Sequence, residues 1–274
     1  MQDFGKPKEV VLDKTTKRIA VRSLTEVVRR MYVAGVTSRE EFRQWLSDGR
    51  VLRGVSRLFE YHQQDDMPSI NQLFSVSFHP IYELVLLNYS QTAANRLHKY
   101  PKGWTDPLIT CRGIVFSYEA KPRPAGISLE KAFNHHEPQS AHIFSTENHD
   151  WVEATVKHDG DLVFVFRHQH EGGDVFVATT RGSFVSPTSM LVSPMIEKLA
   201  VSNNWHDRFP PNTTLSFEFI HPDTEHVIKY DGLKELKLIA AVRVDTLLDY
   251  RYGYLCQLAK HLGVKVTEKV DMSI

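Results

Sequence analysis

The sequence has little cysteine and no excess of charge of either sign. Its 274 residues include two cysteines, Cys111 and Cys256, which lie far apart and in no metal-type spacing. A disulfide framework is therefore excluded, and a reducing compartment is indicated. Lysine plus arginine equals aspartate plus glutamate at 33 each. No overall basic excess points to a polyanion partner, although a local basic stripe is enough to bind nucleic acid.

Long hydrophobic runs are missing as well. No apolar stretch approaches the roughly 20 residues of a membrane span. Residues 1–10 are charged and lack the apolar core of a secretion signal. We therefore expect a cytoplasmic protein. The composition, 42% hydrophobic and 24% charged, is that of an ordinary globular protein without internal repeats or low-complexity tracts.

The first sixty-odd residues have helical patterns. Apolar residues recur at helical spacing after Ser23, at Leu24, Val27, Val28 and Met31. Ser38 and Glu41 form a capping-box pattern that predicts the start of a second helix, with Gly49 as its C-terminal stop. The polar segment 63–68 indicates a linker. We therefore predict an N-terminal helical extension over residues 1–68 and a second domain over residues 69–274.

From about Leu73 onward, short strand-like runs are divided by proline, glycine and asparagine. The predicted strands cover 84–89, 113–118, 151–157, 162–168, 175–180, 214–220 and 236–244. Apolar residues occupy both alternating sets in 162–168, which is typical of a strand buried on both faces. One helix is predicted from Ser189 to Ala200, with Pro194 as an alternative restart. The prediction is an α+β chain with antiparallel sheets.

The segment Lys157-His158-Asp159-Gly160 lies between two predicted strands. A lysine at a strand end, beside a glycine turn, can direct its amine into a cleft and act there as a nucleophile. Taken alone, the segment is also compatible with a hairpin turn that has Asp-Gly at its tip. Its companions in the sequence favour the first interpretation.

These companions come in a fixed order. Upstream stand Cys111-Arg112-Gly113-Ile114 and Lys131-Ala132-Phe133-Asn134; downstream stand Arg181-Gly182-Ser183, Phe217-Glu218-Phe219 and Lys237-Leu238-Ile239. The series resembles the phage-type ATP-dependent RNA ligases, the family of the T-even phage enzyme that seals broken tRNA. The resemblance covers roughly residues 88–244. It implies an antiparallel-sheet nucleotidyltransferase domain of the ATP-grasp-like ligase type.

The resemblance also implies the chemistry. Lysine attacks the α-phosphate of ATP, AMP moves to an RNA 5′-phosphate, and a 3′-hydroxyl displaces AMP. The implied cofactors are ATP and Mg²⁺, and the implied partner is RNA with 5′-phosphate and 3′-hydroxyl ends, with tRNA and an end-healing repair enzyme as candidates. A phage-encoded member would act in the host cytoplasm.

Residue roles follow from the matching positions. Lys157 would be the nucleophile, and Asp159 would orient it or hold a water on Mg²⁺. Arg112 and Lys131 would offset phosphate charge in the transition state. Glu218 would face the nucleotide, away from Phe217 and Phe219, and hydrogen-bond the ribose. The remaining nucleotide-binding candidates are Thr155, Val156, Gly160, Arg181 and Lys237.

Several features remained outside these roles. We expect His158 to be exposed rather than catalytic. The pairs His135-His136 and His168/His170 are weak metal candidates, because further ligands are not evident. Gly160 would allow close backbone approach to the nucleotide or supply a positive φ.

Two further family segments, an E-G-hydrophobic and a K-hydrophobic-K segment, do not appear between Asp245 and Ile274. Glu268 is followed by lysine, and Lys265-Val266 is interpreted as part of a short strand. We expect a truncated chain, with a natural fragment or a non-catalytic nucleotide- or RNA-binding relative as alternatives. A DNA ligase or a GTP-using capping enzyme is a further alternative, which the segments at Arg112 and Lys131 disfavour.

Overall fold

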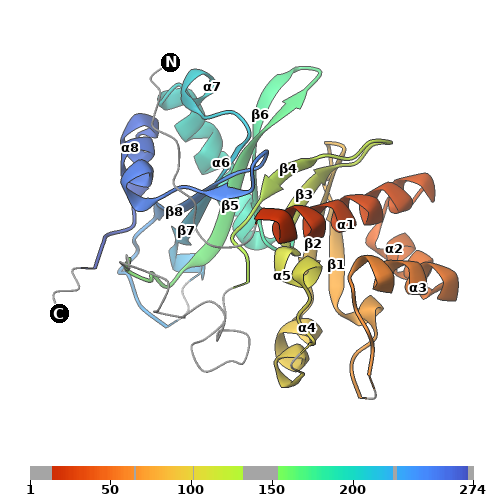
Figure 1. The fold of residues 1–274 in the computed structure, drawn as a ribbon. Coiled ribbons are helices and arrows are strands. Elements are labelled where there is room, and N and C mark those ends of the chain that lie inside the picture. The colour runs from red at the N-terminus through yellow and green to blue at the C-terminus, as the bar shows by residue number, and fades with distance from the viewer. Residues whose placement is uncertain (1–13, 65, 101, 132–153, 225–226, 271–274) are drawn as a thin grey trace. The chain divides into compact units, whose positions relative to one another are not determined.

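A computed structural model describes the chain except for residues 1–13, 65, 101, 132–153, 225–226 and 271–274 (Figure 1). The described residues divide into two compact units. We call residues 14–124 and 129–131 the N-terminal unit, and residues 125–128 and 154–270 the C-terminal unit. None of the helices in the described part has the length and apolar character needed to span a bilayer.

The N-terminal unit begins with three helices, α1 (Lys14–Val33), α2 (Arg39–Ser47) and α3 (Gly49–Leu58). The predicted stripe of α1 is confirmed, because Leu24, Val27, Val28 and Met31 are all fully buried. The helix starts earlier than the sequence indicated, since Ala20 and Val21 extend the buried stripe toward the N-terminus.

The capping box of α2 is confirmed. The Ser38 hydroxyl accepts the backbone N–H of Glu41, and the Glu41 carboxylate accepts the backbone N–H of Ser38. Helix α2 ends at Ser47, next to the predicted stop at Gly49, but Asp48 rather than the glycine forms its C-cap. The Asp48 carboxylate caps a new helix through the N–H groups of Arg50 and Val51. Gly49 is therefore the first residue of α3.

Three antiparallel strands follow, β1 (Phe74–Phe78), β2 (Leu84–Tyr89) and β3 (Arg112–Ser117), with η1 (Ile70–Gln72) before them. Helices α4 (Gln91–Arg96) and α5 (Asp106–Thr110), with η2 (Leu97–Lys99), connect β2 to β3. Gly113 has a φ of 79° at a register shift where Asn88 pairs with Arg112 and Leu87 with Ile114. The glycine after Arg112 therefore forms a bulge that a side chain would disfavour. The chain then enters β4 (Pro124–Ile127).

The C-terminal unit is built on a sheet with the strand order β10-β8-β7-β5-β6. Its long strands are β5 (Asp161–His170), β6 (Gly173–Thr180), β7 (Thr213–Ile220) and β8 (Glu235–Arg243), all antiparallel to their neighbours. The short β9 (Leu248–Asp249) pairs with β8 antiparallel, whereas β10 (Lys265–Val266) pairs with β8 in parallel. The predicted short strand at Lys265-Val266 and the α+β class with antiparallel sheets are confirmed.

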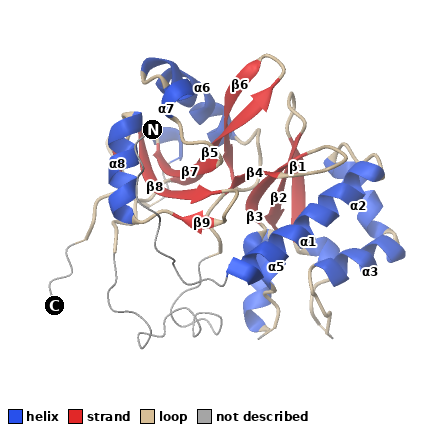
Figure 2. Cartoon of the chain, turned by 45° about the horizontal axis from the view of Figure 1, so that its top comes forward, coloured by secondary structure: helices blue, strands red, loops and turns tan. Residues whose placement is uncertain are grey.

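Helices α6 (Pro187–Ser202), α7 (Trp205–Arg208) and α8 (Tyr252–Leu262) pack on one face of this sheet, and η5 (Pro222–Thr224) follows β7 (Figure 2). The core of that face includes Val163, Val165, Phe217 and Phe219. Helix α6 continues through Pro194 without a restart.

The opposite face of β5 is buried too, as predicted, since Phe164 and Phe166 are fully buried. A Cβ on Gly126 would lie 2.5 Å from the Phe166 ring, and the Ile127 N–H donates to the Thr214 hydroxyl at 3.0 Å. Residues 125–128 therefore cover one end of this face.

Candidate functional site

Lys157 lies on the segment that leads into β5. A strand was predicted over 151–157, of which residues 151–153 lie outside the described residues. The prediction is wrong for residues 154–157, where only Thr155 makes an isolated β-bridge, to Lys269. Thr155, Val156 and Lys157 are exposed. The Lys157 ammonium makes no hydrogen bond or ion pair with any residue that the structure describes.

The main chain before Lys157 is held by the segment that follows β10. The Val156 N–H donates to the Glu268 carbonyl at 2.9 Å, and the Thr267 hydroxyl donates to the Val156 carbonyl at 3.0 Å. The Val270 N–H donates to the Ala154 carbonyl at 2.8 Å. Residues 267–270 therefore act as a partner strand for residues 154–156.

Asp159 is held through both its main chain and its side chain. Its N–H donates to the Tyr230 hydroxyl at 2.9 Å, and its Oδ2 accepts the N–H groups of Val227 and Ile228, each at 2.7 Å. The loop before β8 reverses at Asp231 and Gly232, which have φ values of 51° and 81°. The carboxylate thus ties the lysine loop to the loop that carries Tyr230.

Gly160 has no room for a side chain. A Cβ at this position would lie 2.4 Å from the carbonyl oxygen of Phe219. Its φ is not positive, so of the two expected reasons for glycine the positive φ is wrong. The close approach is to the backbone of β7, and it lets the Gly160 N–H donate to the Glu218 carboxylate at 2.9 Å.

Glu218 faces away from Phe217 and Phe219, as the alternation on β7 predicted. Those two rings are fully buried in the helix-covered core, while Glu218 is half-buried on the other face. Burial raises the pKa of Glu218; the Gly160 N–H and the charges of Lys157 and His158 act in the opposite direction. Glu218 is therefore a carboxylate that the electric field of the Lys157 loop helps to keep ionised.

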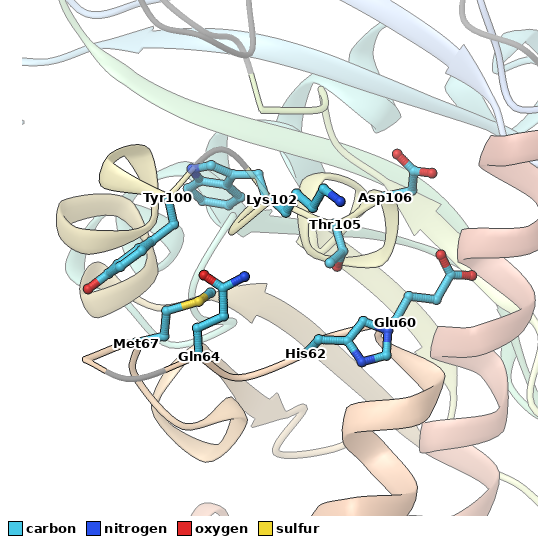
Figure 3. Close-up of a pocket in the computed structure, with 9 residues that line it drawn as sticks. Glu60, His62, Gln64, Met67, Tyr100, Lys102, Thr105 and Asp106 are labelled. Carbon is cyan, nitrogen blue, oxygen red and sulfur yellow. The ribbon is translucent and has the colours of Figure 1, made fainter.

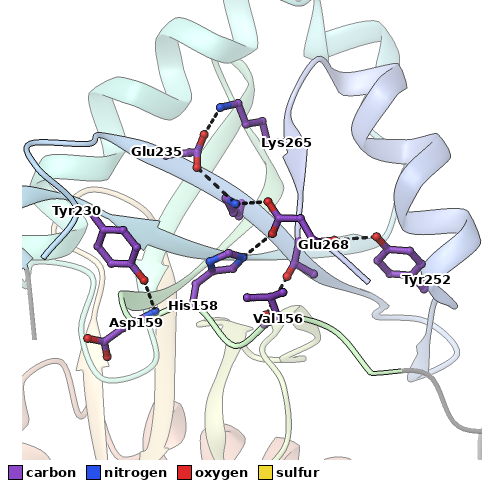
Figure 4. A network of polar contacts seen from close by, with 10 residues as sticks. Val156, His158, Asp159, Tyr230, Glu235, Tyr252, Lys265 and Glu268 are labelled. Carbon is purple, nitrogen blue, oxygen red and sulfur yellow. Dashed lines mark hydrogen bonds and ion pairs between the residues drawn. The ribbon is translucent and has the colours of Figure 1, made fainter. Parts of the chain in front are cut away.

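Lys237 lies directly opposite Glu218 across β7 and β8. Its ammonium is 2.5 Å from Oε1 of Glu268 and 3.8 Å from Oε2 of Glu235. Lys265 pairs with the other oxygen of Glu235. These pairs form one polar network beside the lysine loop (Figure 4).

His158 belongs to the same network, and the expectation that it is exposed is wrong. Its side chain is 10% exposed, and its Nε2 lies 2.8 Å from Oε2 of Glu268. No local pattern assigned a role to Glu268, because the two partners lie 110 residues apart. The only local signal was that Glu268 follows the short strand at Lys265-Val266.

Arg181 is half-buried directly after β6. Thr180 pairs with Val163, and the neighbouring Leu162 pairs with Glu218, so Arg181 lies at the same end of the sheet as Glu218. The Ser183 carbonyl accepts the hydroxyls of Thr179 and Ser189 at 2.9 Å each. The Arg181-Gly182-Ser183 segment thus also builds the turn into α6.

Arg112 and Lys131 belong to the N-terminal unit. The Arg112 guanidinium is half-buried and donates to the carbonyls of Leu129 and Glu130, each at 3.1 Å. The Lys131 ammonium lies 5.2 Å from the centre of the Trp104 ring, a cation–π contact. The structure therefore brings Arg112 next to the residues that precede Lys131; Phe133 and Asn134 lie outside the described residues.

A cavity of about 330 Å³ opens in the N-terminal unit (Figure 3). Trp104 forms part of its wall. Its lining combines the rings of Tyr100 and Trp104 with the polar groups of Gln64, His62 and Lys102. None of the residues predicted to bind the nucleotide lines it. Through Trp104, however, the cavity adjoins Lys131.

Metal ligands do not gather in the part of the chain that the structure describes, where no group of three His, Cys, Asp or Glu residues could hold an ion. Asp159 has one oxygen engaged by two N–H groups. Burial, and then the neighbouring His170, lower the pKa of His168. The pair His135-His136 lies outside the described residues.

No protein-family model matches the sequence, and no curated protein matches it. Among solved structures, the chain is similar to an archaeal ATP-dependent RNA ligase, with 16% identity and a TM-score of 0.45 over 69% of this chain and 44% of that one. It is also similar to Naegleria gruberi RNA ligase with PPi, with 18% identity and a TM-score of 0.34 over 43% of this chain and 36% of that one. A mutant of the Naegleria ligase with ATP and Mn has 17% identity and a TM-score of 0.34 over the same shares. The chain thus spans 36% of the Naegleria ligase chains.

Proposed function

We propose that Lys157 takes up AMP from ATP as the first step of an ATP-dependent RNA-joining reaction. The observation that carries this proposal is a contrast within five residues. Val156, His158, Asp159 and Gly160 are each held by hydrogen bonds, whereas the Lys157 ammonium is unbonded among the described residues. A fixed backbone with a free amine is the arrangement that a positioned nucleophile requires.

The order of the motifs supplies the identity of the reaction. Lys157 Nζ attacks the α-phosphorus of ATP, the bond to the β-phosphate breaks, and pyrophosphate leaves as the amine loses a proton. An RNA 5′-phosphate oxygen then attacks the same phosphorus, and the P–N bond breaks. Finally an RNA 3′-hydroxyl attacks the 5′-phosphate, and AMP leaves.

The residues of the C-terminal unit take the supporting roles in this proposal. Glu218, half-buried and level with Lys237, is assigned to the ribose hydroxyls. Arg181, at the same end of the sheet, is assigned to the ribose or phosphate. Thr155 and Val156 border the nucleotide, and Gly160 keeps the loop close to β7.

Arg112 and Lys131 are proposed as phosphate-binding cations, as the sequence motifs indicate. Their present contacts are with main-chain carbonyls and with the Trp104 ring. The carbonyls and the ring carry no net charge, so these contacts are compatible with binding phosphate. The assignment of residues 69–274 to an adenylyltransferase domain and of 1–68 to an appendage likewise remains a proposal.

The described residues do not fit a metal site built from protein groups alone. Magnesium usually binds through one or two carboxylates, water and the phosphates of its substrate. We propose that Mg²⁺ arrives with ATP. We assign Asp159 mainly to orienting the lysine loop, because its carboxylate already accepts two backbone N–H groups.

The test uses the 274-residue chain and ATP labelled on its α-phosphate. After incubation with Mg²⁺ and denaturation, wild type should carry label that is acid-labile and base-stable. Lys157→Ala should carry none, and Lys260→Ala, which removes an exposed lysine on α8, should match wild type. Label that persists in Lys157→Ala would overturn the assignment of the nucleophile.

The same experiment separates the alternatives. Labelling by GTP in place of ATP would favour a capping enzyme. Transfer of AMP to a nicked DNA duplex rather than to RNA would favour a DNA ligase. Wild type that binds ATP without forming label would favour a non-catalytic nucleotide-binding chain.

A further inference from the structure

Glu268 is a carboxylate of the polar network beside the lysine loop. Its side chain is 56% exposed, yet both oxygens contact side chains that are almost buried. Oε1 meets Lys237, whose side chain is 12% exposed, and Oε2 meets His158, whose side chain is 10% exposed. One carboxylate thus joins the residue after Lys157 to the residue opposite Glu218.

The main chain around Glu268 holds the other side of Lys157. The Glu268 carbonyl accepts the Val156 N–H, and the adjacent Thr267, fully buried, donates its hydroxyl to the Val156 carbonyl. The Tyr252 hydroxyl donates to the Thr267 carbonyl at 2.9 Å, which anchors this segment to α8. Residues 156 and 158 are therefore both fixed from the same short segment (Figure 4).

The charge of Glu268 is part of this arrangement. Hydrogen bonding from Lys237 is the main reason that the pKa of Glu268 falls to about 2, and His158 contributes in the same direction. Glu235 is the second carboxylate near Lys237, but it also pairs with Lys265. Without the charge of Glu268, Lys237 would be drawn toward Glu235, and His158 would lose its partner.

We propose that Glu268 is a positioning residue for the adenylylation of Lys157. Its carboxylate holds His158 and Lys237 together, and its carbonyl holds Val156, so that the lysine between 156 and 158 points toward the face that carries Glu218. This inference rests on the proposed function. It assigns a role in the reaction to a residue outside the motifs that identified the site.

The first arm of the test measures the reaction. Single-turnover AMP transfer to Lys157 and equilibrium binding of ATP are compared for wild type, Glu268→Gln, Glu268→Ala and the control Glu171→Gln, an exposed glutamate in the β5–β6 turn. A displaced reacting group costs up to about a hundredfold in rate. We expect both Glu268 variants to transfer AMP at least about tenfold more slowly while ATP binding changes much less, and Glu171→Gln to match wild type.

The second arm does not depend on AMP transfer. Hydrogen exchange at the N–H groups of Val156 and Asp159 should speed up in Glu268→Gln and stay unchanged in Glu171→Gln. Unfolding curves show whether each variant is folded. Glutamine has nearly the same size as glutamate, so Glu268→Gln still tests the proposal if Glu268→Ala does not fold.

The outcomes separate the two proposals. Wild type that takes no AMP overturns the proposed function and with it the positioning role. Wild type that takes AMP, with Glu268→Gln equal to it in rate, overturns the positioning role alone. Unchanged exchange at Val156 and Asp159 also overturns the positioning role, because the carboxylate then does not hold the loop. Loss of ATP binding in proportion to the rate would make Glu268 a binding residue instead.

Discussion

The basic residues of the two units are held in different ways. In the C-terminal unit, Lys157 is unbonded among the described residues, while its neighbours are fixed by groups from β7, β8 and the segment after β10. In the N-terminal unit, Arg112 donates two hydrogen bonds to main-chain carbonyls, and Lys131 lies over Trp104. A substitution at Lys157 should therefore lower AMP transfer and leave the free energy of unfolding nearly unchanged. A substitution at Arg112 should lower both.

The largest effect is expected for Lys157→Arg. The substitution keeps the positive charge but replaces the amine with a guanidinium, which stays protonated and is not a nucleophile. We expect no AMP label above background, with an unfolding free energy within about 0.5 kcal/mol of wild type, because the residue is exposed. AMP labelling and urea unfolding, measured on the same preparation, check the loss of label and the unchanged stability. A large loss of stability would show that Lys157 has a structural role too.

Arg112→Ala should lower the stability of the fold as well as AMP transfer. Two carbonyls, those of Leu129 and Glu130, lose a charged donor, which costs about 1–3 kcal/mol in unfolding free energy. Arg112→Lys should restore only part of this stability, since an ammonium does not reproduce the planar guanidinium. Urea unfolding of the three proteins is the measurement. Unchanged stability with lost AMP transfer would place Arg112 in the same category as Lys157.

Glu218→Gln should lower AMP transfer yet raise stability modestly at pH 7. The folded pKa of Glu218 lies above its ordinary value because the side chain is buried. The fold therefore favours the neutral form below the unfolded pKa, about 4.5, and loses that advantage as pH rises through the folded value. The gain from glutamine should shrink as pH falls toward 4. Thermal unfolding of wild type and Glu218→Gln at pH 7 and pH 4 measures this gain. If Glu218→Gln were less stable than wild type at pH 7, burial of the Glu218 charge would not be costly, and the prediction would be wrong.

The smallest expected effect on stability is that of Glu268→Gln. Its folded pKa of about 2 lies below the unfolded 4.5, so its ion pairs stabilise the fold above about pH 4.5, and this contribution is lost as pH falls through 2. Wild type should be slightly more stable than Glu268→Gln at pH 6, and the difference should vanish toward pH 2. It is small because the side chain is 56% exposed and solvent screens the pairs. A pH-independent difference in unfolding free energy would attribute the effect to packing instead.

Local patterns predicted several elements well. The capping box at Ser38 and the doubly apolar strand around Val165 depend on residues within one turn or one strand, and both are confirmed. Helix α8, β1 and α5 were not predicted. The start of α1 was misplaced, because Ala20 and Val21 extend its buried stripe. Helix α3 was not predicted, because Asp48 both ends one helix and caps the next.

In the candidate site, too, features set by a local pattern were predicted and features set by distant contacts were not. The alternation on β7 was sufficient to turn Glu218 away from Phe217 and Phe219. The reason for Gly160 required the approach of β7, which no local pattern contains. No local pattern contains the hydrogen bonds of Asp159 either, whose carboxylate accepts the N–H groups of Val227 and Ile228.

The α+β class, the order of the motifs and the lysine at their centre could be predicted without a structure, because they depend on residue types at short spacing. The groups that surround this lysine follow from the folded chain. Glu268 contacts His158 and Lys237 because β10 pairs with β8 in parallel and the following segment pairs with residues 154–156. Such contacts join residues far apart in the chain, and they depend on strand order and register rather than on any local pattern.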